Sequence, residues 1–403
     1  MAAIFTRQKT ITVEFLGRTV GHSYIPGMSA NHSDPIRYRG YVAYMFAFDL
    51  AYELKDAASI STLLGQPMAE YAVDQSKRSP RHLFFYRPRV VRLPPAERIG
   101  PGGLVRVETT VKLLTVGAVT ITVRVPFETE SISELVAYHD IQFTNGSLQT
   151  DVRSLALRIR DELAPYLVRP IAQVIEEEAF TVFCFNGPLQ SGTGENLNAE
   201  AWLKSHRREV AGLLTQEDDS SELSDQEAEE STQHWLSYYG DDIVVMDWDA
   251  ALLIDAPSDF EEALYVMELA NLQLAELEAY DRLLDDALQS AYRDLRNRAL
   301  RRKTEVLADL RDLRIDLARM NDEMSNITKF FGDWHLARIY SIMAGRFHLA
   351  EWRKNVDEKL RTLNDLYQLL AGDQNNRMML ILEITIVVLF VIDLVILVLG
   401  LKH

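Results

Sequence analysis

Apolar and polar positions alternate with a period of two in much of the N-terminal half of the chain, as in β-strands that bury one face. These runs lie at residues 9–15, 41–49, 83–92, 104–112 and 118–126. Residues 149–167 instead repeat their apolar positions with a helical period, and 179–187 and 243–255 are apolar runs that predict buried strands. The pattern predicts an α+β domain over residues 1–188, completed by strands in 234–257.

The stretch between these parts, residues 189–233, is polar and strongly acidic. Its centre, from Glu217 to Glu230, contains eight acidic residues and no Lys or Arg. Such a segment buries too little apolar surface to offset the entropy lost on ordering it. The order of acids typical of a calcium-binding loop is absent, so the sequence predicts an acidic disordered loop over 189–233.

Residues 258–375 contain no proline and few glycines, and their apolar positions repeat at helical spacing. One seam repeats at alternating steps of four and three residues: Val306, Leu310, Leu313, Leu317, Met320, Met324 and Ile327. This heptad pattern is typical of a coiled coil. With a break at Gly332-Asp333, the pattern predicts a helical hairpin, or coiled-coil stalk, with arms at about 258–331 and 336–375.

Two shorter apolar seams flank the heptad seam. The first is Leu284, Leu288, Ala291 and Leu295, and the second is Trp352, Val356, Leu360, Leu363, Tyr367 and Leu370. Each seam has two interpretations, packing within the hairpin or packing between subunits, and the sequence does not separate them.

The C-terminal residues 378–401 form 24 almost uninterrupted apolar positions. At about 1.5 Å per residue, a helix of this length crosses a bilayer core. Glu383 lies near one end of it, and Asp393 lies about 22 Å into the span. Asp393 is either a tolerated, protonated acid or an acid that faces a partner helix, a second copy or a water-filled path. The segment predicts one transmembrane helix, with the lipid bilayer as a partner.

The start of the chain lacks the apolar core and the small-residue cleavage site of a signal peptide. Two residues follow the predicted span, so we expect the bulk of the protein to lie on one side of the membrane. Lys359, Arg361 and Arg377 precede the span, and Lys402 follows it. This bias favours a single-pass, tail-anchored protein with a cytoplasmic bulk.

Over its 403 residues the chain has a formal net charge of −17, and its single cysteine excludes an internal disulfide framework. The acidity is local, because residues 171–257 carry 19 acidic residues against 3 basic ones. Residues 1–170 are mildly basic and contain Arg87, Arg89 and Arg92 beside a run of aromatic residues. This combination fits either an anion or nucleic-acid contact or the solvent face of a strand.

No nucleotide-binding P-loop, HExxH zinc motif or GxSxG serine motif occurs in the chain. The 9 histidines are scattered, and none pair at a spacing typical of metal ligands. A catalytic alternative rests on four acids that bracket a short apolar run, Asp241, Asp242, Asp247 and Asp249, since acids at a strand end bind divalent metal in nucleases. Without a Lys, His or Glu to accompany them, we predict no enzyme activity, no bound metal and no cofactor.

Three stretches of the C-terminal half carry a family likeness: FTVFCFNGPL at 180–189, ELANLQLAELEAYDRLLDDAL at 268–288, and the anchor with Leu382-Glu383 and a second acid at Asp393. They resemble the "required for meiotic nuclear division" family, also described as Sad1-interacting factors. The resemblance covers about 180–403, apart from the loop at 189–233. It implies a membrane protein of bacteria or mitochondria without established enzyme activity. The absence of a presequence then favours the bacterial over the mitochondrial inner membrane.

Together these features predict a tail-anchored scaffold or tether that presents the α+β domain to an unknown protein partner. The stalk and the intramembrane acid favour a homo-oligomer. The alternative is an oligomeric ion channel of CorA-like architecture in which Asp393 lines the span. A CorA channel needs two spans and a Gly-Met-Asn signature, whereas this chain has one predicted span and places Met320-Asn321-Asp322 in the stalk.

Overall fold

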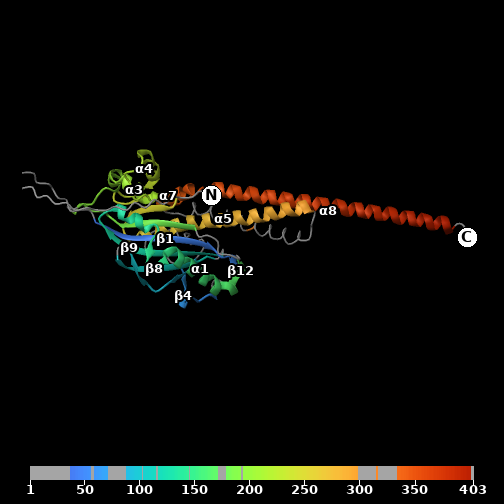
Figure 1. The fold of residues 1–403 in the computed structure, drawn as a ribbon, viewed down its shortest axis with the longest axis horizontal. Coiled ribbons are helices and arrows are strands. Elements are labelled where there is room, and N and C mark those ends of the chain that lie inside the picture. Colours follow the sequence, from blue (N-terminus) through green and yellow to red (C-terminus); the bar gives the residue numbers. More distant parts are fainter. Residues whose placement is uncertain are drawn as a thin grey trace, which may run out of the picture.

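The computed structural model consists of a sheet with helices on both faces and two long helices that extend from it (Figure 1). It describes residues 37–55, 59–70, 88–101, 103–114, 117–144, 146–170, 178–191, 194–297, 315 and 334–400. The expected strand at 9–15 and all seven residues of the heptad seam lie outside this part of the chain. The sheet-rich mixed region followed by helices is therefore confirmed, and the coiled coil stays a prediction.

Ten strands form one sheet in the order β14-β15-β16-β13-β1-β9-β8-β6-β5, with β7 also paired to β8. Their bounds are β1 Tyr38–Asp49, β5 Ala69–Glu70, β6 Arg89–Arg92, β7 Ala96–Gly100, β8 Gly103–Leu113, β9 Ala118–Thr129, β13 Glu178–Asn186, β14 Trp235–Leu236, β15 Ile243–Met246 and β16 Ala250–Asp255. The central strands β9, β1 and β13 are antiparallel, and β16 joins β13 in parallel.

Short strand pairs and helices complete the fold. The pairs are β2 Ala51–Leu54 with β12 Leu167–Pro170, β3 Thr62–Leu63 with β4 Gln66–Pro67, and β10 Gln142–Phe143 with β11 Gly146–Ser147. The helices are η2 Ile132–Tyr138, α1 Leu148–Leu163, η3 Ala164–Tyr166, α2 Ala199–Ser205, α3 Arg207–Thr215, α4 Asp225–Thr232, α5 Phe260–Asn297, α7 Trp334–Arg346 and α8 Leu349–Gly400.

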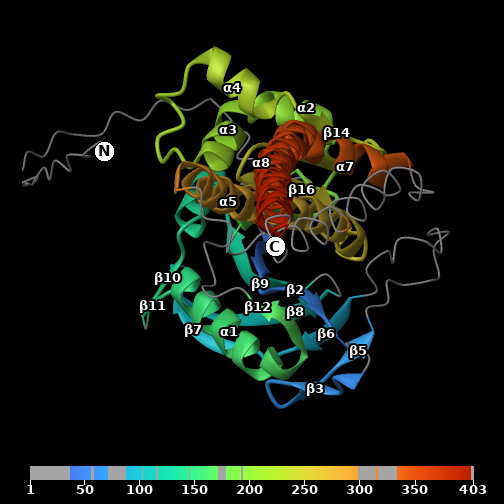
Figure 2. The ribbon, with the colours of Figure 1, turned by 90° about the vertical axis from the view of Figure 1, so that its right-hand side faces the viewer.

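The central strands of the sheet are buried on both faces, and the side chains of each strand alternate between the two faces. In β1, Val42 and Tyr44 belong to the core that α1 and α3 cover, whereas Ala43 and Met45 belong to the core under α5, α7 and α8. In Figure 2, α1 lies on the opposite side of the strands from α5 and α8. A strand such as β13, which is covered on both faces, therefore appears in the sequence as a continuous apolar run.

The acidic segment 189–233 is folded for most of its length, so the prediction of a disordered loop is wrong there. It contains α2, α3 and α4. Trp202, Val210 and Leu213 are buried in the same core as α1. The side chain of Asn198 caps α2 by accepting the backbone N–H of Ala201. A few apolar anchors are enough to order the segment, and its many acids lie mainly on the exposed side.

Helices α5 and α8 run side by side in the same direction away from the sheet, as the colours of Figure 1 show. The predicted hairpin of two opposed arms is therefore wrong for these two helices. Between α7 and α8 the chain turns at Phe347 and His348, and His348 has a φ of 50°. The expected break at Gly332-Asp333 lies outside the described residues.

The described parts of the two shorter apolar seams pack against each other within one chain. Leu284 of α5 and Leu363 of α8 are fully buried in one cluster. The Nζ atom of Lys359 on α8 lies 2.7 Å from carboxylate oxygens of both Asp281 and Asp285 on α5. Because this part of each seam is covered inside the chain, a second subunit is not required to bury it.

Helix α8 continues without a break from this packed part into the apolar C-terminal segment. Residues Met379–Leu397 have a mean hydropathy of 3.0, and the chain buries none of this stretch. Among the described residues, this is the one helix long and apolar enough to cross a membrane. Its length and composition agree with the predicted transmembrane helix.

Candidate functional site

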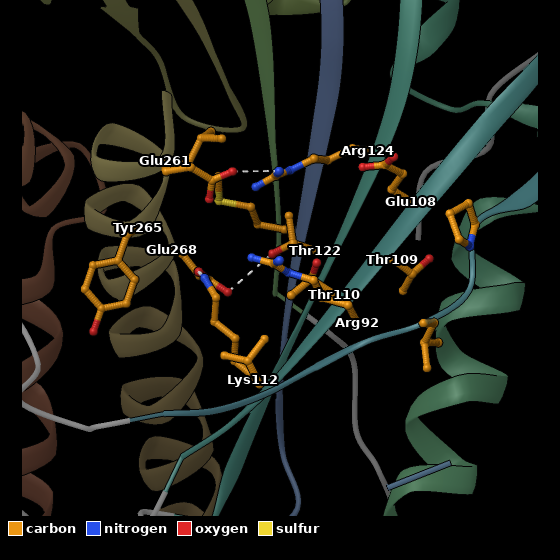
Figure 3. Close-up of a pocket in the computed structure, with 15 residues that line it drawn as sticks. Arg92, Glu108, Thr109, Thr110, Lys112, Thr122, Arg124, Glu261, Tyr265 and Glu268 are labelled. Atoms are coloured by element: carbon orange, nitrogen blue, oxygen red, sulfur yellow. Dashed lines mark hydrogen bonds and ion pairs between the residues drawn. The ribbon is translucent and has the colours of Figure 1, made fainter. Parts of the chain in front are cut away.

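A cavity of about 430 Å³ lies between the sheet and the first turns of α5 (Figure 3). Strands β6, β8 and β9 provide one wall, and α5 provides the other. Six charged side chains line the cavity: Arg92, Glu108, Lys112, Arg124, Glu261 and Glu268. A volume of this size is typical of small-molecule sites. The cavity is therefore the candidate functional site of the sheet domain.

The polar face of β8 and β9 brings the charges into the cavity. Glu108, Thr110 and Lys112 occupy alternate positions of β8, so their side chains leave the sheet on the α5 side. Thr122 and Arg124 do the same on the neighbouring strand β9. The alternation of β8 by itself resembles a solvent-exposed strand face, but α5 covers part of it and buries Lys112.

A buried ion pair between Lys112 and Glu268 fastens α5 to the sheet. Their side chains are only 9% and 6% exposed. The second oxygen of the carboxylate, Oε1 of Glu268, accepts hydrogen bonds from the hydroxyls of Thr120 at 2.5 Å and Thr122 at 3.3 Å. The carboxylate thus has a charged partner and two hydrogen-bond donors, which is the arrangement that a buried charge needs.

A second ion pair lies nearer to the start of α5. Arg124 donates a hydrogen bond to Oε1 of Glu261 at 2.7 Å. Its guanidinium also lies over the ring of Tyr41, 5.3 Å from the ring centre. Glu108 is the register partner of Arg124 across β8 and β9. The Glu261 carboxylate and the Tyr41 ring therefore hold the Arg124 guanidinium in place.

The electrostatics at this end of the cavity favour negative charge. Burial alone works to raise the pKa of the Glu261 carboxyl. The hydrogen bond from Arg124, together with the charges of Arg124, Lys112 and Arg92, nevertheless lowers that pKa below its ordinary value. The three cations therefore set a positive potential where Glu261 lies.

The single thiol of the chain lies near this site. Cys184 lies close to Arg124 and Tyr41, but burial raises the pKa of its thiol far above the usual range. A protonated, buried thiol is a poor nucleophile. Within the described ranges, no group of three His, Cys, Asp or Glu side chains could hold a metal ion.

The structure separates the three arginines of the predicted anion contact. Arg87 lies outside the described residues, and Arg89 and Arg92 stand at the two ends of β6. Because they are three positions apart, their side chains leave the strand on opposite faces. Arg92 lines the cavity, whereas Arg89 is half-buried on the other side. A nucleic-acid contact stays a prediction, and these two residues do not form one strip for it.

Asp247, one of the four acids of the catalytic alternative, has a structural partner. It is buried at the turn between β15 and β16 and forms an ion pair with Arg346 at the end of α7. Arg346 also lies over the ring of Trp248, 5.2 Å from the ring centre. Asp249 is exposed in the same turn. The pair thus holds α7 to the sheet, and this position is explained without a metal.

The two acids of the C-terminal helix, Glu383 and Asp393, are exposed. They lie within the stretch of α8 that the chain leaves entirely unburied. No other described element covers them, so any group that neutralises or pairs with Asp393 comes from outside the described part of this chain.

A third cluster of charges lies where the far ends of β1 and β13 meet α5. Burial raises the pKa of Asp49 to about 7, against a lowering effect of Arg282. The pKa of Glu178 is raised to about 8 by burial and by its hydrogen bond with Glu278. Arg282 lies 3.4 Å from the Glu278 carboxylate. Three acids therefore lie near one arginine, Arg282, in the middle part of α5.

We expect Glu178→Gln to raise stability at pH 9 and to leave it almost unchanged at pH 5. In the unfolded chain this carboxyl loses its proton near pH 4, whereas the folded protein holds it up to about pH 8. Glu178 therefore destabilises the fold progressively as the pH rises between these values. The charges that face it, Glu278, Arg282 and Asp249, remain in the variant.

The measurement for Glu178 is the thermal midpoint of the full-length protein in mild detergent at both pH values. The control is Glu222→Gln, which changes an exposed acid in the α3–α4 connection. Equal midpoints of the wild type and Glu178→Gln at pH 9 would contradict the assigned proton.

Comparison with known proteins finds relatives of the sheet domain. The model of the family described as "Uncharacterized protein MJ0711, N-terminal domain" matches residues 39–261. This range begins in β1 and ends at Glu261 in the cavity. The chain is also 25% identical to "Uncharacterized protein MJ0711" of Methanocaldococcus jannaschii over 270 residues, which is 67% of this chain and 79% of that protein. No solved structure matches the chain.

These matches correct the family expected from the sequence. The likeness to the "required for meiotic nuclear division" family is wrong, because the matching family and relative are different ones. Its motifs were an apolar strand, a helix opening and an acid-containing anchor, and such patterns arise in any buried strand or membrane helix. With more than half of its length matched, the chain belongs to the family of the MJ0711 N-terminal domain.

Proposed function

We propose that this protein is a membrane-anchored tether that holds its sheet domain at a set distance from a bilayer and presents it to a partner. The observation that carries the proposal is the continuity of α8. One helix, Leu349–Gly400, begins in the core against α5 and ends in an uncovered apolar stretch. A single helix with these two halves joins a folded domain to a membrane without a flexible linker.

The packing of α8 gives the tether its direction and reach. From Leu349 to Met379 the helix spans about 45 Å at 1.5 Å per residue. Among the residues of α8 whose burial the structure describes, Leu363 is the last fully buried position before the apolar stretch. From there to Met379 the helix covers about 24 Å. The domain is therefore held away from the bilayer surface rather than laid against it.

The proposed tether has its sheet domain on the cytoplasmic side of the membrane. Arg361 and Arg377 precede the apolar stretch, and this bias supports a cytoplasmic sheet domain. The matched relative is archaeal, so the comparisons give no support to the bacterial inner membrane in particular. We therefore propose that the protein lies at the cytoplasmic face of a cell membrane.

The test of anchoring is the behaviour of the full-length protein in washed membranes. We expect it to stay in the membrane pellet after washing at alkaline pH and to enter solution only with detergent. A protein held by its sheet domain or by charge would leave the pellet in the alkaline wash, and that result would contradict the tether.

We further propose that α8 associates with copies of itself through Asp393. The support is chemical: an acid deep in a span is costly unless another polar group faces it. The described residues contain one candidate span. No second span in this part of the chain can face Asp393, so we propose that the facing polar group belongs to another copy of the chain. A channel of the CorA-like kind would require several chains around Asp393.

We expect Asp393→Leu to leave membrane insertion intact and to reduce the mass of the assembly. The reason is that leucine removes the hydrogen-bonding group but keeps the span apolar. The measurement is the mass of the protein in mild detergent. Glu383→Leu is the matched control, because this acid lies near the end of the span and reaches the interface. An unchanged mass for Asp393→Leu would indicate a tolerated acid.

A further inference from the structure

The charges of the cavity are matched unevenly, although three cations face three acids. Lys112 is paired with Glu268. Arg124 is paired with Glu261, and Glu108 lies 3.9 Å from Arg106 of its own strand. Within the described residues, no ion pair engages Arg92 (Figure 3). Its charge acts at longer range, on Glu261.

Arg92 lies beside a hydroxyl on the same side of the sheet. It is the register partner of Thr110, and both side chains line the cavity. Arg92 is exposed, so its guanidinium can meet a ligand without first being uncovered. A guanidinium with a neighbouring hydroxyl is a good receptor for a carboxylate, because it donates several hydrogen bonds to one anionic group.

Several other lining residues are apolar. Val90 and Leu93 come from β6 and the residues after it, Met45 comes from β1, and Leu264 comes from α5. An apolar group of a ligand would pack on the part of these side chains that faces the cavity, whereas an inorganic ion would not. The cavity therefore combines the guanidinium of Arg92, which a ligand can reach, with several apolar lining residues.

We propose that the cavity binds a small organic monoanion, with its carboxylate on Arg92 and Thr110 and its apolar body over Val90 and Leu264. A second negative charge is disfavoured, because Glu108 and Glu261 lie on the remaining sides. This inference concerns the sheet domain and is independent of the membrane anchor.

The test uses three probes against the full-length protein in a non-ionic detergent. Phenylacetate has the charge and the apolar body, phenylacetamide has the body alone, and inorganic phosphate has charge alone. Binding is measured by saturation-transfer NMR and by calorimetric titration. We expect saturable binding of one phenylacetate per chain, about tenfold tighter than phenylacetamide, since a charged hydrogen bond is lost in the amide. We expect no binding of phosphate.

Two matched arginine variants locate the site. Arg92→Gln should reduce the affinity for phenylacetate about tenfold, to the level of phenylacetamide. Arg158→Gln is the control, because Arg158 is an exposed arginine of α1, on the other face of the sheet, that does not line the cavity. It should leave the affinity unchanged. Both positions are exposed, so neither variant is expected to impair folding.

Four results would overturn the proposal. They are the absence of saturable phenylacetate binding, equal affinity for phenylacetate and phenylacetamide, binding of phosphate as tight as that of phenylacetate, and an Arg92→Gln variant with unchanged affinity. The third result would assign a bare anion site instead, and the second would assign a purely apolar one.

Discussion

Replacing Glu268 with alanine is expected to lower the free energy of unfolding by about 3–5 kcal/mol, because it leaves the ammonium of Lys112 buried without its partner. The hydroxyls of Thr120 and Thr122 lose the same acceptor. The measurement is urea denaturation of the full-length protein in mild detergent. The loss reflects a charge left alone in the interior more than the strength of the pair itself.

Two further variants separate this cause from others. Glu200→Ala removes the partner of Lys204 in an exposed ion pair of α2 and should change stability by less than about 0.5 kcal/mol. The double variant Lys112→Met with Glu268→Met removes both charges and should recover most of the loss. A loss of under about 1 kcal/mol for Glu268→Ala would show that the pair does not fasten α5 to the sheet.

A chain ended after Asn375 is expected to leave the membrane completely and to remain folded in solution. The removed stretch holds 15 Leu, Ile, Val or Phe residues within Met379–Leu397. At about 0.3 to 0.6 kcal/mol each, they favour insertion by roughly 5 to 9 kcal/mol, against about 3 kcal/mol for Asp393. The packed part of α8, through Leu363, is retained.

The distribution of this shortened chain between washed membranes and the soluble fraction checks the expectation. A chain ended after Gly400 keeps the whole apolar stretch and should stay in the membrane, so it controls for the loss of the C-terminus itself. If the chain ended after Asn375 remained in the washed membranes, another part of the protein would have to anchor it.

The sheet was predictable where local pattern and burial agree. The runs at 41–49, 104–112, 118–126 and 179–187 correspond to β1, β8, β9 and β13. Each places apolar side chains on at least one buried face, which is the signal that the sequence carries. Short strands such as β2 and β12 lacked that signal, because two to four residues are too few to show a period.

The prediction that the acidic segment is disordered was wrong for a physical reason. Between Glu217 and Glu230 the acids dominate the composition, yet Ala228 of α4 and Leu213 of α3 are buried and decide the fold. Composition averages over exposed and buried positions, so a few anchors are lost among many surface charges. The direction of α5 relative to α8 was equally inaccessible, because an apolar seam does not encode whether its partner is parallel.

The candidate site was out of reach of sequence reasoning alone. Lys112 and Glu268 are 156 positions apart, and no local spacing connects them. The sequence does show a strand with Thr110 and Lys112 on one side, and it shows Glu261 in the first turn of a helix. Their meeting depends on how α5 crosses the sheet, which the apolar residues of both elements determine.

The most direct test of the account is a cysteine-accessibility scan along α8 in sealed membrane vesicles. Cys184 is fully buried and provides a silent background. With Asp365→Cys, Ile386→Cys, Phe390→Cys and Gly400→Cys, a membrane-impermeant maleimide should label position 365 from the cytoplasmic side and position 400 from the opposite side, and it should leave 386 and 390 unlabelled. Labelling of 386, 390 and 400 from the same side as 365 would contradict a spanning helix and, with it, the tether.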